Sequence, residues 1–299
     1  MNNITLPQPH KIVKIIHETK AEYTFRVHYE GKTDHGQFFM LSIPKIGEAP
    51  ISVSSRGEDY VEFTIRKVGR LTDGLFGMNE GDTLFMRGPY GNAFPVESFK
   101  GKNLVVVAGG TGMAPVRSML QYFAAHPEEI QSVYFIVGFK DRDAVLFEDD
   151  LKAFSQAEKF HTIYCLDNME AEGFHKGFVT NYIKDVPFAE FDDFNVAIVG
   201  PPAMIGFTAK ECVKNGVTEE KIWVSFERKM SCAVGKCGHC KINETYVCLE
   251  GPVFNYTKAK VEGHLFILGS EIEAVVKSTS ELSPFNLIAY SYPGTTCCK

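Results

Sequence analysis

Four cysteines in one short segment constrain this chain more than any other feature. They are Cys232, Cys237, Cys240 and Cys248. Their spacing, C-x4-C-x2-C-x7-C, begins with the four-residue and two-residue gaps that are typical of plant-type [2Fe–2S] ligands. Gly235 and Gly238 lie between them and would let backbone amides approach the sulfur atoms. The segment therefore predicts a loop that binds a [2Fe–2S] cluster.

A zinc site with four cysteine ligands is the alternative for this segment. Zinc ribbons generally use two well-separated C-x2-C pairs, and only one such pair is present here. The spacing favours iron–sulfur, and a zinc-stabilised binding module remains the hypothesis from a different class. His239 stands between two ligands, but with four cysteines available we do not interpret it as a ligand.

Composition sets limits on the partners and the location of the chain. The 299 residues are 44% hydrophobic and 23% charged, as expected for a globular chain of about two domains. A net charge of −6 makes nucleic acid or an anionic membrane surface a poor partner. The N-terminus lacks the pattern of a signal peptide, and no run of about 18 apolar residues occurs. We therefore expect a cytoplasmic protein.

The chain divides into segments with different patterns of apolar and polar residues. Residues 1–97 contain short β-branched and aromatic runs punctuated by Gly, Asp and Pro, which predicts a small antiparallel barrel. Residues 101–225 alternate apolar strands with helical stretches, which predicts a doubly wound α/β domain with a parallel sheet. Residues 226–256 hold the cysteines. Residues 257–299, with Cys297 and Cys298, form a tail to which we assign no role.

Two glycine-containing loops follow buried strands of the α/β region. The first lies between the strand at 104–108 and the next helix, and the second follows the strand at 195–199. Both fall at carboxyl ends of strands, where open α/β sheets bind ligands, and a helix N-terminus there attracts phosphate. A tight turn without a ligand is the alternative for the first loop. The candidate nucleotide contacts are Gly110, Thr111, Gly112, Pro115, Gly200, Pro201 and Pro202.

Asp167 bears on the choice of nucleotide. It follows a strand that ends at Leu166, and a carboxylate there tolerates a ribose hydroxyl better than a 2′-phosphate. The sequence thus favours NADH over NADPH. Lys140 and Arg142, which follow a neighbouring strand, argue in the other direction.

Further motifs give the chain a family resemblance. The barrel region contains the stretches 49–54 (APISVS), 66–72 (RKVGRLT) and 88–92 (GPYGN). With the two glycine loops, the cysteines and the following 251–254 (GPVF), these resemble the ferredoxin–NADP reductase superfamily over about residues 8–256. The resemblance extends to the branch that contains the electron-transfer subunits of dihydroorotate dehydrogenase and of anaerobic sulfite reductase, together with cytosolic sulfhydrogenase gamma subunits.

The resemblance implies a cofactor for each segment. The barrel would bind FAD, the α/β domain NADH, and the C-terminal loop one [2Fe–2S] cluster. Arg66 and Thr72 would contact the ribityl-pyrophosphate portion of FAD, although Arg66 could also be an ordinary solvated strand residue. The residues expected to line the flavin ring are Pro50, Ile51, Ser52 and Val53, with the Ser52 hydroxyl near N5 as the candidate catalytic group.

Three features depart from the superfamily pattern. Ala49 stands where many members carry an arginine that pairs with the phosphates, so Arg66 or Arg70 would have to compensate. Val199 stands where many reductases place a cysteine beside the nicotinamide. The tail after Tyr256 has no counterpart that we identify.

The implied function is an electron-transfer subunit that oxidises NADH through FAD and passes single electrons through the cluster to a partner. The stretch 227–230 (ERKM) together with the cysteine loop most resembles the sulfite reductase electron-transfer subunit and the sulfhydrogenase gamma subunit. We therefore expect partner subunits with iron–sulfur and sirohaem-type centres, as in anaerobic sulfite reductase. A cytosolic hydrogenase or dihydroorotate dehydrogenase partner is the alternative, as is a self-sufficient reductase with a small acceptor.

The cysteine loop also suggests where a partner would bind. Lys236, His239 and Lys241 surround three of the ligands, and electron transfer requires close approach to the acceptor. We expect this face to dock against the partner. An ordinary solvated rim is the alternative.

Overall fold

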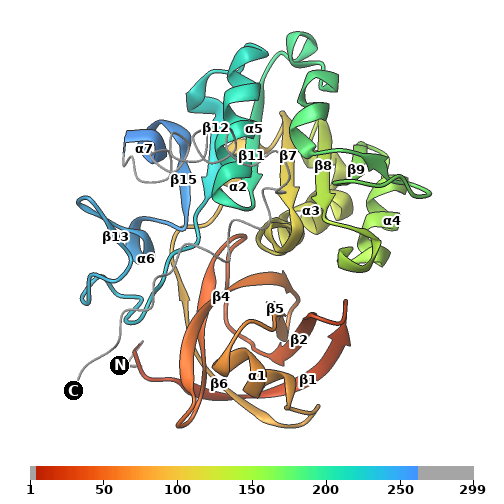
Figure 1. Cartoon of the computed structure of the whole chain (residues 1–299). Coiled ribbons are helices and arrows are strands. Elements are labelled where there is room, and N and C mark those ends of the chain that lie inside the picture. Colours follow the sequence, from red (N-terminus) through yellow and green to blue (C-terminus); the bar gives the residue numbers. More distant parts are fainter. Residues whose placement is uncertain (1–4, 262–299) are drawn as a thin grey trace, which may run out of the picture.

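The computed structural model describes residues 5–261. Cys297 and Cys298, with most of the segment to which the sequence assigned no role, lie outside this range. The described residues form a barrel and an α/β domain stacked on one another, with the cysteine loop beside the junction (Figure 1). Within residues 5–261, no helix is long and apolar enough to cross a membrane.

The N-terminal body is a closed six-stranded barrel whose neighbouring strands are antiparallel, as predicted. Its core contains Phe25 and Phe63, which face each other across paired strands, and Phe39, which packs edge-on against Phe63. Around the barrel the strand order is β1-β2-β5-β4-β3-β6. The elements are β1 (Gln8–His17), β2 (Glu22–His28), β3 (Phe38–Ile43), β4 (Gly47–Arg56), β5 (Tyr60–Arg66), α1 (Arg70–Phe76) and β6 (Thr83–Tyr90).

A seven-stranded sheet forms the second body, in the order β10-β9-β8-β7-β11-β12-β15. All strand pairs except the last are parallel, which confirms the predicted doubly wound domain. Chain order reverses between β7 and β11, so this is the switch point where open sheets bind ligands. The strands are β7 (Asn103–Gly109), β8 (Ser132–Phe139), β9 (Phe160–Leu166), β10 (His175–Lys176), β11 (Phe194–Val199), β12 (Ile222–Ser225) and β15 (Val253–Asn255).

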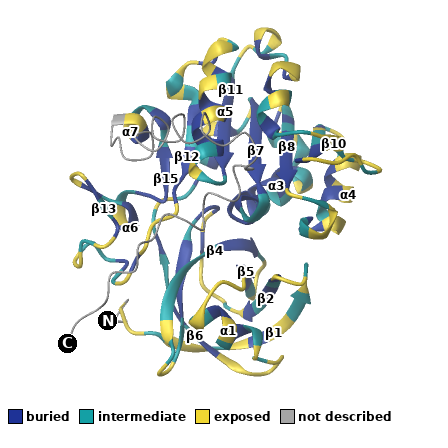
Figure 2. Ribbon diagram, viewed as in Figure 1, coloured by how far each residue is buried: buried dark blue, intermediate teal, exposed yellow. Residues whose placement is uncertain are grey.

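Helices cover both faces of the sheet. Alternate side chains of β7 point to opposite faces: Leu104 and Val106 pack with α3 and α4, whereas Val105 and Val107 pack with α5. The sheet is buried along most of its length (Figure 2). The helices are α2 (Val96–Phe99), α3 (Met113–Ala125), α4 (Glu148–Gln156) and α5 (Pro202–Lys214), and the 3₁₀ turns are η1 (Gly110–Gly112), η2 (Pro127–Glu129), η3 (Arg142–Ala144), η4 (Val179–Asp185), η5 (Phe188–Glu190) and η6 (Glu219–Lys221).

The cysteine segment leaves the sheet and returns to it. After β12 the chain forms a small hairpin and a short helix, and β15 then pairs antiparallel with β12. Tyr256 and Ala259 of the last helix are buried against this edge of the domain. The elements are β13 (Lys241–Ile242), β14 (Thr245–Tyr246), α6 (Val247–Glu250) and α7 (Tyr256–Val261).

Helix α3 joins the α/β domain to the barrel through buried polar contacts. Arg117 Nη1 donates to Glu62 Oε2 of β5 at 2.6 Å, and Arg117 also pairs with Asp150 of α4. His35 Nδ1 lies 3.0 Å from Ser118 Oγ, and burial lowers the pKa of this imidazole to about 3, so it is neutral there. These contacts fix one domain against the other.

Candidate functional site

The two glycine loops meet at the switch point of the sheet. A Cβ atom on Gly112 would lie 2.5 Å from the carbonyl oxygen of Val199 and 2.8 Å from the Cα of Gly200. Only glycine at position 112 permits this approach, since real Cβ atoms essentially never come so close to backbone. The loop after β7 and the loop after β11 therefore form one continuous edge, as the sequence predicted for a nucleotide site.

The candidate residues of these loops have different surroundings. Gly110 is part-exposed with φ of 53°, a left-handed conformation that suits glycine. Thr111 is also part-exposed, and Pro201 and Pro202 begin α5. Pro115, by contrast, is buried in the first turn of α3, where its missing N–H is harmless. The structure thus leaves Gly110 and Thr111 accessible and gives Pro115 a packing position.

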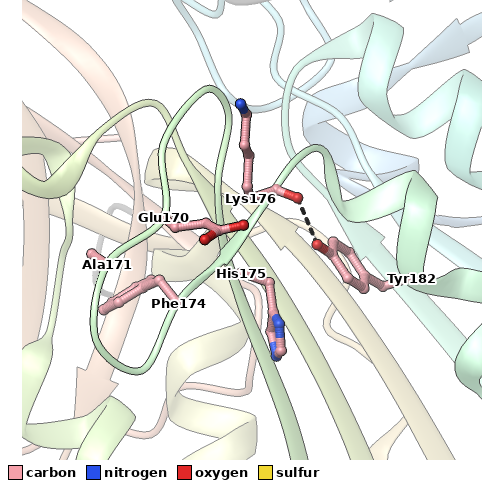
Figure 3. Close-up of a pocket in the computed structure, with 6 residues that line it drawn as sticks. All are labelled: Glu170, Ala171, Phe174, His175, Lys176 and Tyr182. Atoms are coloured by element: carbon pink, nitrogen blue, oxygen red, sulfur yellow. Dashed lines mark hydrogen bonds between the residues drawn. The ribbon is translucent and has the colours of Figure 1, made fainter.

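A pocket of about 590 Å³ is lined by residues that follow β9 in the chain, whereas Asp167, which directly follows β9, is buried and is not among the lining residues. The chain turns back after Asp167, and β10 pairs parallel with β9 so that Lys176 lies opposite Leu166. The Tyr182 hydroxyl donates to the Lys176 carbonyl oxygen at 2.7 Å and closes one side. Figure 3 shows the lining residues, which are Glu170, Ala171, Phe174, His175, Lys176 and Tyr182.

The cations near this pocket differ from those considered from the sequence. Arg142 is paired with Glu148 at 2.7 Å, and its guanidinium lies over the Phe174 ring. His175 and Lys176 lie beside Cys165 and Leu166 at the end of β9, because a two-residue strand pairs with β9 there. No local pattern signals so short a strand, which is why sequence reasoning missed both residues.

The expected flavin strand is β4. Ser52 pairs with Phe38 and Pro50 with Met40 on the neighbouring strand, and the side chains of Pro50, Ile51 and Ser52 are part-exposed. Val53 is fully buried in the barrel core. A cofactor at this strand could therefore contact Val53 only through its backbone.

The turn between β5 and α1 provides cations for a diphosphate. Arg66, Lys67 and Arg70 are all exposed there, and Arg66 is 46% exposed although it pairs with buried Glu22. Three cations within one turn fit the diphosphate of FAD, a group that arginine binds well. They also supply positive charge in place of the arginine that many superfamily members carry at the position of Ala49.

The structure gives Thr72 a local task. Its hydroxyl accepts N–H donors from Val68 and Gly69 at 2.9 and 3.0 Å and donates to the Gly69 carbonyl at 2.8 Å. The side chain is buried. Thr72 therefore shapes the turn that presents the cations, and direct contact of its hydroxyl with FAD remains a prediction from the resemblance.

Glu227 is a candidate that the sequence marked only as part of a motif. It follows the end of β12 and is exposed. Desolvation by neighbouring protein atoms raises the pKa of its carboxyl, and the positive charge of Arg66 opposes this shift. The charges of Arg66 in the barrel and Glu227 at the start of the cysteine segment therefore interact.

Backbone amides point at the cysteine sulfurs. Cys232 Sγ accepts N–H donors from Val234, Lys236 and Cys237 at 3.3–3.5 Å. Cys248 Sγ accepts the N–H of Gly235 at 3.3 Å. Such donors stabilise thiolates, which are the form that binds metal. The left-handed residues that turn the loop are Ala233, Gly235 and Gly238.

The four cysteines influence one another electrostatically. The Cys237 side chain interacts with Cys232, and that of Cys248 interacts with both Cys240 and Cys232. Hydrogen bonds from the backbone of His239 and Cys232 lower the pKa of Cys237 to about 7, whereas burial raises the pKa of Cys248 to about 12. Among the described residues, no three possible ligands gather at one ion position. Four cysteines, two of them with backbone N–H donors at their sulfurs, fit a [2Fe–2S] cluster, in which each iron takes two cysteine ligands.

Comparison with known proteins identifies the same two regions. Residues 106–210 match the family described as oxidoreductase NAD-binding domain. Residues 227–260 match the iron-sulfur cluster binding domain of dihydroorotate dehydrogenase B. The first match includes both glycine loops and Asp167, and the second includes all four cysteines.

Relatives and solved structures extend the likeness over most of the chain. The sulfhydrogenase 2 gamma subunit of Pyrococcus furiosus is 37% identical over 243 residues, which cover 75% of this chain and 83% of that protein. The probable dihydroorotate dehydrogenase B (NAD(+)) electron transfer subunit of Methanocaldococcus jannaschii is 32% identical over 253 residues, covering 84% and 90%. A structure of an NADH-dependent reduced ferredoxin-NADP oxidoreductase is similar in fold, with a TM-score of 0.70, 22% identity and coverage of 92% and 100%.

We expect Cys237→Ser to remove or destabilise the [2Fe–2S] centre while FAD stays bound, because this ligand lies outside the barrel. Iron, sulfide and flavin content of the purified variant measure the effect. Cys212→Ala, which removes a buried thiol of α5, serves as the control and should retain its iron. A Cys237→Ser variant with a full complement of iron and sulfide would show that the ligand assignment is wrong.

We also expect NADH to give a higher kcat/KM for flavin reduction than NADPH, by about tenfold or more. The carboxylates of Asp167 and Glu170 would repel a 2′-phosphate, and about 1.4 kcal/mol of repulsion corresponds to a factor of ten. Stopped-flow reduction with each nucleotide measures the ratio. Equal or better use of NADPH would contradict the prediction, and a loss of that activity in Lys176→Ala would then identify Lys176 as the phosphate partner.

Proposed function

This chain belongs to the family of electron-transfer subunits that includes those of sulfhydrogenase (gamma) and dihydroorotate dehydrogenase B, and we propose from this premise that it delivers NADH electrons to a hydrogenase-type catalytic subunit. It is an NAD(H)-dependent oxidoreductase subunit of the ferredoxin–NADP reductase superfamily, with FAD and an iron–sulfur cluster as its cofactors. The partner is the proposed part of this statement.

The observation that supports delivery of electrons to a partner protein is the exposure of one cluster ligand. Cys237 is exposed, whereas Cys240 and Cys248 are buried. Lys236, next to it in the chain, is exposed as well, and Leu249 is 52% exposed nearby in sequence. A redox centre that reaches the surface beside a cation and an exposed leucine suits transfer to another protein.

Each segment of the chain has a separate task in this proposal. FAD, when bound, accepts electron pairs from NADH and releases electrons singly, and the cluster carries one electron at a time. Gly110, Thr111 and Gly200 offer backbone to the pyrophosphate of the nucleotide. Arg66 would hold the FAD diphosphate, and Ser52 would offer its hydroxyl to the flavin ring. The chemistry belongs to the cofactors, so the protein contributes binding, orientation and exclusion of water.

The relatives favour a different partner from the one that the sequence suggested. The 227–230 stretch and the cysteine loop resembled both the sulfite reductase and the sulfhydrogenase subunits, and we expected a sulfite reductase. The relatives are instead sulfhydrogenase gamma and dihydroorotate dehydrogenase subunits. We therefore propose the hydrogenase-type partner in place of a sirohaem subunit. Dihydroorotate dehydrogenase is a second candidate, because the family model that matches the cysteine segment is that of dihydroorotate dehydrogenase B.

The complex purified with its own subunits distinguishes these acceptors. NADH-driven formation of H₂ would support the hydrogenase-type partner. NAD⁺-dependent oxidation of dihydroorotate would support the second candidate, and NADH-driven reduction of sulfite would restore the sirohaem-type partner.

The docking face is tested by reversing one charge. Lys241 already pairs with Glu244 at 2.9 Å, so Lys236 is the better position. We expect Lys236→Glu to slow electron delivery to the partner several-fold, with a larger effect at low salt. Activity from NADH to ferricyanide should hardly change, because this small acceptor can take electrons from the flavin.

Lys152→Glu is the matched control, since this exposed lysine belongs to α4, which lies on the far side of the molecule from the cysteine loop (Figure 1). It should leave both activities unchanged. Loss of both activities in Lys236→Glu would mean that the loop is needed for folding or flavin chemistry. Equal behaviour of the two variants would show that the partner binds elsewhere.

A further inference from the structure

A buried arginine of the barrel contacts the first cluster ligand. Arg87 lies on β6, and its side chain is only 6% exposed. Nε and Nη2 donate to the two carboxylate oxygens of Glu48 on β4, at 2.7 and 2.6 Å. This bidentate ion pair fixes the plane of the guanidinium and raises the pKa of the arginine, so the side chain stays positively charged.

Other hydrogen bonds of the same guanidinium reach the cysteine loop. Nη1 donates to the Cys232 carbonyl oxygen at 2.7 Å and to the Tyr90 hydroxyl at 3.2 Å, and Nη2 donates to the Ser231 carbonyl oxygen at 2.8 Å. One side chain thus joins two barrel strands to the start of the cysteine loop, about 145 residues later in the chain.

The end of the loop is held by the same stretch of barrel. Asn92 donates from its backbone N–H to the Gly251 carbonyl oxygen at 2.6 Å and from Nδ2 to the Glu250 carbonyl oxygen at 2.7 Å. Gly91 has a φ of 77°, and a Cβ atom on it would lie 2.6 Å from the same Gly251 oxygen. The segment 87–92 therefore holds the loop at Cys232, where it begins, and just after Cys248, where it ends.

The segment 87–92 is also connected to the expected flavin strand, through the ion pair of Arg87 with Glu48. Glu48 stands two residues before Pro50 on β4. The strand places the carboxylate that orients Arg87 next to the residues expected at the flavin ring. One ion pair thereby links the cysteine loop to the flavin strand.

We propose that Arg87 is a positioning residue that holds the cluster loop against the flavin strand and raises the reduction potential of the cluster. The inference rests on the proposed function, since it needs the cluster to be present. A cation beside Cys232 favours the reduced cluster, which carries one more negative charge. Glu48 offsets part of this effect, so the two residues act on the potential with opposite signs.

Two substitutions distinguish the effect of Arg87 on the position of the cysteine loop from the effect of its charge on the cluster potential. Arg87→Gln removes both the positive charge and the bidentate hydrogen bonds of the guanidinium. We therefore expect the reduction potential of the cluster to fall and a chelator to remove iron about tenfold faster. Glu48→Gln leaves Arg87 its carbonyl contacts but removes the compensating charge, so we expect a higher potential and a smaller change in iron release. Redox titration followed by electron paramagnetic resonance, and chelator kinetics on the anaerobic holoprotein, measure these effects.

Arg26→Gln is the matched control. Arg26 pairs with Glu62 of the same barrel at 2.7 Å, and within residues 5–261 it makes no hydrogen bond or ion pair to the cysteine loop. Its substitution should change neither the potential nor the rate of iron release. Arg87→Gln that behaves like Arg26→Gln would overturn the inference.

Arg87→Lys covers the case in which Arg87→Gln does not fold. Lysine keeps the charge but cannot reproduce the fork, so the potential should stay near that of the wild type while iron release is faster. Unchanged iron release in Arg87→Lys would overturn the positioning role. Wild-type protein that is purified anaerobically and contains no iron would instead overturn the proposed function, and the inference with it.

Discussion

The buried ion pair between Arg117 and Glu62 sets the geometry on which the function depends. Glu62 lies in the barrel wall with its side chain 1% exposed, and Arg117 reaches it from the helix that follows the first glycine loop. Removing one partner of a buried ion pair costs about 3–5 kcal/mol when the other charge is left without a partner. Here Arg26 also pairs with Glu62, and Asp150 also pairs with Arg117, which reduces that cost. The expected flavin strand and the nucleotide loops belong to different domains. Their relative position is therefore fixed by this contact and by the neutral His35 beside Ser118.

A second connection ties the cysteine loop to the same frame. The loop is held at both ends by the barrel segment 87–92 and returns to the sheet through β15. Its middle, with Cys237, is exposed. This arrangement combines an inner side, which Arg87 and Glu48 link to the strand expected to contact the flavin, with an outer side that is exposed. In the proposed function, the nucleotide loops, the barrel strand β4 and the cysteine loop would carry the electrons in turn, although these segments are far apart in sequence.

The sequence predicted those features that depend on local patterns. Apolar runs such as 104–108 identify buried parallel strands, and the cysteine spacing identifies a cluster loop because both signals are contained in a few residues. Contacts between distant segments leave no such trace. Arg87 and Glu62 look like ordinary strand residues, and Lys176 lies beside Leu166 only because a two-residue strand pairs with β9. Thr72 shows the converse: a residue expected at the cofactor has its hydroxyl bound within its own turn.

The proposed path carries electrons from NADH to a surface cluster within one chain, and one measurement tests it directly. NADH is added anaerobically to the purified holoprotein without any partner, and the sample is examined by visible absorption and electron paramagnetic resonance. We expect the flavin absorption to bleach and the signal of a reduced [2Fe–2S] cluster to develop in the same sample. A flavin that is reduced while no cluster signal develops, in protein that contains iron and sulfide, would contradict this path.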